Sequence, residues 1–278
     1  MTSLTAEPRY FQHATRDRSK TALTVAARFW FATAVIGQWI FVAYIMGFYG
    51  AAALRGDFEA WNKVFPRGHI AGDTLGNFSI GFHLLLAVLI TLGGQLQLVP
   101  QVRALAPALH RWNGRVFLVA VVSTSLVGLY LVWGRGGSSG DLMQHLGISL
   151  DAVMILLCAS LAVRHAMAGN IATHRRWALR LFMVVNAVWF FRVGLMFWLL
   201  VNNGPVGFDA KSFTGPFLSF LSFADVLLPL AVLELYLRAQ EGGSVIGRTV
   251  TAALVVTLTL AMAIGVCVAT IGMWLPHM

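Results

Sequence analysis

Four of the eight histidines have a spacing that suits a pair of haem sites. His83, His110, His145 and His174 each lie near one end of an apolar stretch, and they alternate between two depths on consecutive predicted helices. One level holds His83 and His145, and the other holds His110 and His174, roughly 21 Å away at 1.5 Å per helical residue. Two imidazoles that face each other at one level are typical axial ligands of a haem b. The pattern therefore predicts up to two haem b groups, one for each pair.

Arginines cluster around the second histidine pair. They are Arg111, Arg115, Arg175, Arg176 and Arg180. A guanidinium group binds a carboxylate through two parallel hydrogen bonds, so these side chains suit the propionates at the edge of a haem. The same residues also satisfy the positive charge that cytoplasmic helix ends carry, or contact anionic lipid heads. Both interpretations remain open at this stage.

Further polar residues lie inside apolar stretches. They are Asp151, Asn186, Arg192 and Asp225. Polar groups at membrane depth are costly, which makes them candidates for function. Arg192 and Asp225 lie at similar depth on consecutive predicted helices, so we expect them to form an ion pair. Such a pair either locks the two helices together or supplies a counter-charge for a ligand or a proton path from the outer side.

Seven apolar stretches are long enough to carry these residues across a bilayer, which takes about 20 mainly apolar residues. The sequence is 58% hydrophobic and only 11% charged. The stretches are 27–50, 76–100, 111–133, 144–166, 175–202, 215–238 and 248–274. We predict an all-α polytopic integral membrane protein that forms a single domain over residues 1–278. Residues 76–202 are its four-helix core, with an internal repeat, and Pro107 and Asn170 or Thr173 are expected to begin two of the helices.

Basic residues indicate how the chain is oriented. Fourteen of the twenty lysines and arginines fall on the side of the N-terminus, five fall on the other side, and Arg192 lies within the fifth stretch. Cytoplasmic loops carry such an excess, so we predict that the tail over 1–26 is cytoplasmic and that the C-terminus lies outside. The outer loop over 51–75 is long enough to fold over the membrane, with a short interfacial helix before Pro66. Membrane topology also explains the net charge of +9 without nucleic acid as a partner.

Two histidine-led motifs resemble a known family. "LHRWNGRVF" contains His110, Arg111, Gly114 and Arg115, and "HRRWALR" contains His174, Trp177 and Arg180. These motifs, with Arg192 downstream, resemble the His-Arg-x-x-Gly-Arg and His-x-x-Trp-x-x-Arg elements of domain-of-unknown-function family 2306. That family comprises uncharacterised bacterial predicted membrane proteins, and the resemblance covers about residues 75–200. It implies a bacterial inner (plasma) membrane location and assigns no activity.

A looser resemblance concerns architecture. Cytochrome b561-type proteins look like four helices with four alternating histidines, paired second with fourth and third with fifth. Trp112 and Gly114 also correspond to positions in a His-Ser-Trp-x-Gly element of those cytochromes. The resemblance implies the same two histidine pairs and a diheme protein.

Two functions remain open from the sequence. The first is a diheme b-type transmembrane electron carrier, and so a potential oxidoreductase, that works between a redox partner on one side and an acceptor or quinone on the other. The second is a non-redox carrier, lipid-binding protein or partner-binding subunit whose histidines and arginines form a structural hydrogen-bond network. Direct metal binding is less favoured because the chain has no HxxxH or HExxH spacing. The sequence does not decide whether His69 or His165 replaces one of the four proposed ligands.

Overall fold

The protein consists of helices joined by short loops in a computed structural model that describes residues 9–65, 67–135 and 140–278, with side chains from residue 18 onward. The first part comprises α1 (Arg9–Tyr44), a π-helical turn (Ile45–Gly50), α2 (Ala51–Leu54), a 3-10 helix (Phe58–Lys63), α3 (Thr74–Leu98), α4 (Pro100–Leu105) and α5 (Pro107–Trp133). The second part comprises α6 (Leu142–Met167), α7 (Ile171–Val184), α8 (Ala187–Val201), α9 (Pro216–Gly242), α10 (Val245–Ala269) and two terminal turns (Thr270–Trp274 and Leu275–His277).

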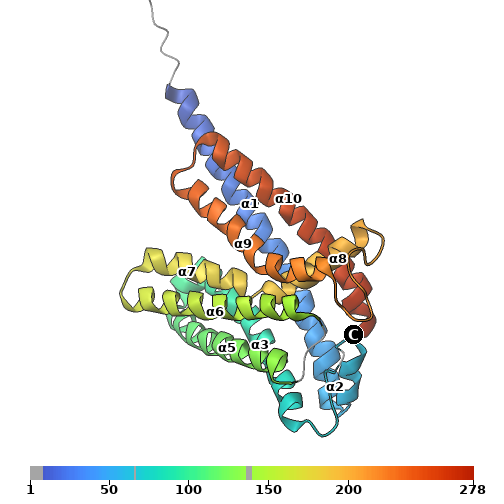
Figure 1. Ribbon diagram of the computed structural model, residues 1–278. Coiled ribbons are helices and arrows are strands. Elements are labelled where there is room, and N and C mark those ends of the chain that lie inside the picture. Colours follow the sequence, from blue (N-terminus) through green and yellow to red (C-terminus); the bar gives the residue numbers. More distant parts are fainter. Residues whose placement is uncertain (1–8, 66, 136–139) are drawn as a thin grey trace, which may run out of the picture.

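The expected all-α, multi-pass membrane architecture is confirmed. Six helical segments of the described chain are long and apolar enough to cross a bilayer, and α7 with α8 forms a seventh if the pair is one span bent by 48°. The first candidate span covers Arg18–Leu54, and α1 begins at Arg9. The tail predicted over 1–26 is therefore helical from Arg9 onward. Figure 1 shows the start of α1 and the C-terminus at opposite ends of the long helices.

The spanning helices form two groups (Figure 1). In the four-helix group, α3 packs against α5, α5 against α6, and α6 against α7. In the long-helix group, α10 packs against α1, α8 and α9. Figure 1 shows α1, α9 and α10 running at an oblique angle to α5, α6 and α7. The bent fifth span belongs half to each group, so the predicted core over 76–202 loses α8 to the long-helix group.

Side-chain amides satisfy the backbone groups that the bend between α7 and α8 leaves without helical hydrogen bonds. The backbone N–H of Asn186 donates to Met183 at 3.2 Å, three residues back, and therefore no longer serves the carbonyl of Phe182. The Asn186 side chain replaces it, because its Nδ2 donates to that carbonyl at 2.7 Å. Its Oδ1 accepts from Gln38 Nε2 of α1 at 2.9 Å. A break inside a membrane is tolerated where other groups satisfy the freed backbone in this way.

The same amides link three spans. Gln38 Oε1 accepts from Gln95 Nε2 of α3 at 2.7 Å. Gln95 Oε1 in turn accepts from Trp39 Nε1 of α1 at 2.7 Å. Gln38, Gln95 and Asn186 are all buried. We call Gln38, Trp39, Gln95 and Asn186 the amide network, and it joins the four-helix group to the long-helix group.

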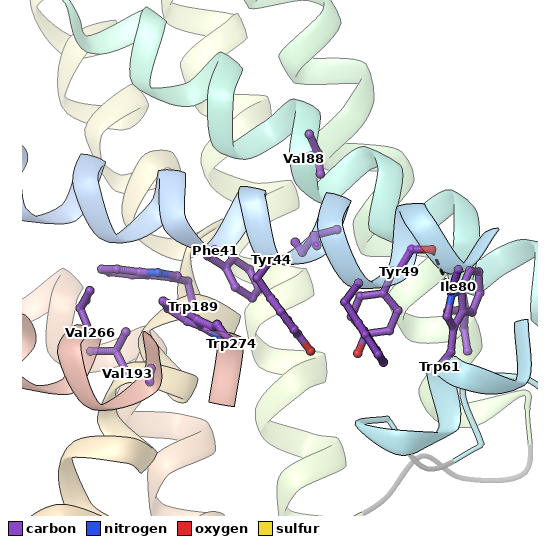
Figure 2. Close-up of a cluster of buried hydrophobic side chains, with 14 of the residues drawn as sticks. Phe41, Tyr44, Tyr49, Trp61, Ile80, Val88, Trp189, Val193, Val266 and Trp274 are labelled. Atoms are coloured by element: carbon purple, nitrogen blue, oxygen red, sulfur yellow. Dashed lines mark hydrogen bonds between the residues drawn. The ribbon is translucent and has the colours of Figure 1, made fainter. Parts of the chain in front are cut away.

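An aromatic core fills the half of the long-helix group that lies next to the loop over 51–75. We call this side of the bundle the outer side and the opposite side the inner side, after the orientation that the sequence predicts. Figure 2 shows Phe41 and Tyr44 of α1 beside Trp189 and Trp274, which come from α8 and the turn after α10. The same core continues to the outer loop, where Trp61 Nε1 donates to the carbonyl of Tyr49 at 3.1 Å. This packing positions the side of α8 that carries Arg192.

The outer loop forms the short helix that was expected before Pro66, as a 3-10 helix over Phe58–Lys63. Pro66 itself lies outside the described residues. Arg135, which follows α5, fastens the loop: its Nε lies 2.6 Å from Asp73 Oδ2, and its Nη2 donates to Asn77 at 2.6 Å. Asp73 also caps α3 by accepting from the N–H of Gly76 at 2.9 Å. Hydrogen bonds from Arg135 and from the Gly76 N–H lower the pKa of Asp73.

Candidate functional site

The inner histidines, His110 and His174, are brought together. Pro107 begins α5, and Asn170 caps α7 by accepting from the N–H of Thr173 at 3.3 Å, as expected. These starts place one imidazole in the first turn of each helix, and the two rings are close enough to interact electrostatically. In the packing order α3, α5, α6, α7, the two histidines lie on helices that are not consecutive.

The two inner imidazoles differ in their hydrogen bonds. His174 Nδ1 lies 2.9 Å from the carbonyl oxygen of Ala162 in α6. A carbonyl only accepts, so the neutral ring donates from Nδ1 and keeps Nε2 free as a ligand atom. His110 Nδ1 is buried and has no hydrogen-bond partner within the described part of the chain. Ligand histidines are commonly oriented in the way that His174 is, through the other ring nitrogen.

The outer histidines, His83 and His145, have separate surroundings. A Cβ on Gly128 of α5 would lie 3.6 Å from His83 Cε1, and His83 is within electrostatic range of Arg192. His145 meets the ring of Trp133 edge-on, with ring centres 5.6 Å apart. Its carbonyl accepts from the Ser149 hydroxyl at 2.7 Å. The pairing of His83 with His145 stays a prediction.

The arginines near the inner pair divide into two kinds. Arg180 Nε lies 2.7 Å from Glu234 Oε1, and its guanidinium stacks 4.5 Å from the ring centre of Trp177. Arg176 Nη1 lies 3.0 Å from Glu241 Oε1. Both carboxylates come from α9, so these two arginines tie α7 to the long-helix group.

Arg111 and Arg115, in contrast, are exposed near the start of α5. The guanidinium of Arg115 lies 4.8 Å from the ring centre of Trp112, which is 64% exposed. An exposed tryptophan beside arginines at a helix start is typical of a membrane interface. Of the five arginines that suit a haem edge, Arg176 and Arg180 are engaged by carboxylates of α9, whereas Arg111, Arg115 and Arg175 are exposed.

The expected ion pair between Arg192 and Asp225 is wrong. The ion pairs of the described residues join other side chains, and the Arg192 guanidinium lies 5.4 Å from the ring centre of Phe41 in α1. Its Nη1 donates to the carbonyl of Val188 at 3.2 Å. Asp225 instead lies within electrostatic range of Asp151 in α6. Residue counting placed both side chains at one depth, but the direction of each around its helix axis decided their partners.

Several residues that organise the site were not among the sequence candidates. Gln38 and Gln95 hold the bend through Asn186, and Glu241 pairs with Arg176. The signal for the glutamines was present in the sequence: a carboxamide inside an apolar span needs a partner on another helix. Within the described residues, no group of three or more histidine, cysteine, aspartate or glutamate side chains could hold a metal ion.

Comparison with known proteins gives one match. Residues 80–211 match the model of a family described as "Predicted membrane protein (DUF2306)". No curated protein and no solved structure matches the chain. The matched segment contains both histidine-led motifs, whereas none of the comparisons supports the resemblance to cytochrome b561-type proteins. Over residues 80–211, therefore, this multi-pass membrane protein is similar to an uncharacterised family of predicted membrane proteins.

Proposed function

We propose that the protein binds a haem b through His110 of α5 and His174 of α7, and that it carries electrons within the membrane. The observation that supports this proposal is that two imidazoles, in the first turns of α5 and α7, are within electrostatic range of each other. The Ala162 carbonyl holds the His174 ring with Nε2 free. When bound, haem iron would supply one-electron chemistry, and the protein would tune it through ligands and burial.

The packing beneath the histidines defines where such a group fits. A Cβ on Gly94 of α3 would come within 3.0 Å of Phe117 and 3.4 Å of Phe182, so these rings fill the bundle about two helical turns deeper than the histidines. These apolar rings would exclude water from a haem held by the inner pair. Arg111 and Arg115, which are exposed near the start of α5, would bind its propionates.

A second haem at His83 and His145 remains part of the proposal. His83 supports it through its buried Nδ1, which lacks a partner among the described residues. Arg192 would place a positive charge beside this group, and a nearby positive charge favours the reduced, less positive state of an iron centre. Two groups at different depths would let electrons pass between an outer redox partner or quinone and an inner one.

The absorption spectrum of the purified protein tests the proposal, oxidised and then reduced with dithionite, with haem quantified per chain. We expect a Soret band and sharp reduced bands, and we expect His110→Ala and His174→Ala to remove the inner haem's share. His277→Ala is the matched control, because His277 Nδ1 bonds the Met273 carbonyl at the far end of α10. A folded wild-type protein without a Soret band, even after expression with haem precursor, would rule out the proposal.

A non-redox role is the second candidate, and one observation favours it. Asn186, Arg176 and Arg180, which were selected as site residues, make structural bonds that join helices. If the histidines act in the same way, the protein is a carrier, lipid-binding protein or partner-binding subunit. A colourless, stable protein whose melting temperature falls in His174→Ala would support this role, because that variant loses the bond to Ala162.

A further inference from the structure

The contact between the two helix groups along α9 is secured at both ends. At the outer end, the Ser219 hydroxyl donates to Asp141 at 3.0 Å. One turn further in, a Cβ on Gly147 of α6 would come within 2.5 Å of the Ser222 carbonyl oxygen. At the inner end, the ion pairs of Glu234 and Glu241 hold α9 to α7. We call this contact of α9 with α6 and α7 the seam.

Two carboxyl groups meet in the middle of the seam. Asp141 lies opposite Ser219 and Gly147 opposite Ser222, so α6 and α9 run in the same direction. One turn further inward, this register brings Asp151 level with Asp225, and the two are within electrostatic range. Each has a buried Oδ1 without a hydrogen-bond partner in the described part of the chain. Buried polar atoms without a partner are rare, and a bound ion or water is one physical explanation for them.

The backbone adds another acceptor at the same place. Pro229 lies inside α9 and has no N–H, so the carbonyl of Asp225, four residues earlier, cannot receive its usual helical hydrogen bond. Carbonyls released by breaks in membrane helices are known ligands of small cations. This feature of α9 is independent of the two acidic side chains, and it also supplies an acceptor.

A neighbouring helix contributes a hydroxyl. Thr124 of α5 follows Ala120 and Val121 on the face that packs in one cluster with Ile155 of α6 and Val226 of α9. Its Oγ1 is buried without a partner among the described residues. Ile155 lies one turn after Asp151, and Val226 directly follows Asp225, so the hydroxyl borders the same part of the bundle.

Nearby cations are directed elsewhere. Arg180 of α7 is paired with Glu234, and Arg192 of α8 lies over Phe41 and acts on His83 of α3. On α6, His145 lies six residues before Asp151, near the ring of Trp133, and the Cys158 thiol lies two turns inward of Asp151. Arg248 of α10 donates to Ala239 at the inner end, and the remaining titratable groups of the surrounding helices include Tyr130 of α5, His174, Arg175 and Arg176 of α7, and Tyr236 of α9. The centre of the seam thus combines two carboxyl groups and several acceptors without a neutralising partner. Two ionised carboxylates in this position are costly unless a positive charge joins them.

We propose that Asp151 and Asp225 form a binding site for one monovalent cation, either a proton shared by the two carboxyl groups or a Na⁺-sized ion. One positive charge converts two mutually repelling carboxylates into a bridged pair with a single net negative charge. The described residues offer no third histidine, cysteine, aspartate or glutamate ligand for a divalent metal. The Asp225 carbonyl and the Thr124 hydroxyl suit a small cation, because oxygen atoms are the ligands of hard ions.

Infrared spectroscopy of the full-length protein in lipid nanodiscs tests the site and identifies the cation. We compare wild type with the double variant Asp151→Asn/Asp225→Asn at neutral pH without Na⁺. We expect the wild type alone to show the C=O stretch of a protonated, buried carboxyl group. If this band is unaffected by NaCl, the site binds a proton; if NaCl removes it and KCl does not, the proton is replaced by Na⁺.

A control variant and a second measurement distinguish loss of the cation site from failure to fold. Asp57→Asn changes an exposed carboxyl group of the outer loop, and its spectrum should keep the buried carboxyl band. The thermal midpoint of the wild type should also depend on pH or Na⁺. The thermal midpoint of the double variant should lack this dependence, because its asparagines keep the size of the side chains but remove both carboxyl groups from the seam. A wild type without a carboxyl band, and with the same cation dependence of melting as the double variant, would overturn the proposal.

Discussion

The four-helix group and the long-helix group contribute different chemistry. All four proposed haem ligands lie in α3, α5, α6 and α7. The long-helix group supplies the partners: Gln38 of α1 for the bend, and Glu234 and Glu241 of α9 for the arginines of α7. The family match over 80–211 covers most of the first group and α8 but omits α1, α9 and α10. Side chains outside the matched segment therefore determine which arginines inside it remain available to a ligand.

The largest expected effect comes from a close contact between two helix backbones in the long-helix group. It tests whether helices pack more tightly there than in the four-helix group. A Cβ on Gly265 of α10 would come within 2.5 Å of the Val193 carbonyl of α8, whereas one on Gly94 of α3 would meet only the Phe117 and Phe182 rings. We expect Gly265→Ala to lower the free energy of unfolding by about 3 kcal/mol and Gly94→Ala by about 1 kcal/mol, because a ring shifts more easily than a helix backbone. Denaturant titration in detergent measures both.

Gly114→Ala is the matched control for these two variants. A Cβ there would make ordinary contacts with Gln97 at 3.5 Å. Its stability should change little, since alanine also favours a helix over glycine. Equal losses in all three variants would show that packing in the two groups is alike.

The amide network should matter next, because it joins the groups. Asn186→Ala leaves the Phe182 carbonyl and the Gln38 amide without a buried partner, so we expect a loss of about 2 kcal/mol. Asn202→Ala is the control, since Asn202 makes the same type of bond to a carbonyl four residues back at the open end of α8. Thermal denaturation followed by circular dichroism checks both, and a smaller loss for Asn186→Ala than for Asn202→Ala would contradict this role.

The two ion pairs between α7 and α9 should differ in strength. Arg180 and Glu234 are 18% and 33% exposed as side chains, whereas Arg176 and Glu241 are 38% and 55% exposed. We expect a coupling energy of about 1 kcal/mol for the first pair and less than about 0.5 kcal/mol for the second, because water screens exposed pairs. Double-mutant cycles with Arg→Met and Glu→Gln measure each coupling energy. A larger coupling energy for the more exposed pair would show that solvent exposure does not determine the strength of these ion pairs.

The smallest expected effect is the loss of stability at the outer loop when the pH is lowered. The pKa of Asp73 is lowered from its usual 3.8 by Arg135 and the Gly76 N–H. Because the folded value is the lower one, its stabilising effect is complete above about pH 4 and is lost as the pH falls through the folded pKa. The thermal midpoint of Asp73→Asn should therefore lack this part of the wild-type decline below pH 4. If the thermal midpoint of Asp73→Asn declined in the same way as that of the wild type, the contact between Asp73 and Arg135 would not contribute to stability.

Composition and apolar length determined the membrane architecture. Spans of about 20 residues must satisfy their backbones as helices, so the all-α multi-pass architecture and the approximate limits of the spans followed from the sequence alone. Pro107 and Asn170 likewise begin their helices where local rules require. The bend at Asn186 did not follow, because an asparagine breaks a span only when a residue such as Gln38 reaches it from another helix.

The sequence determined the depth of each polar side chain in the membrane, whereas the tertiary structure decided the direction in which that side chain points. Counting residues along helices placed His110 level with His174, and Arg192 level with Asp225, because rise per residue is nearly constant. His110 and His174 are within electrostatic range of each other, whereas Arg192 lies over Phe41 and Asp225 is within electrostatic range of Asp151. Rotation about each helix axis and the choice of neighbouring helix depend on packing between segments far apart in the chain. Those contacts alone decided which charges are paired and which carboxyl groups meet.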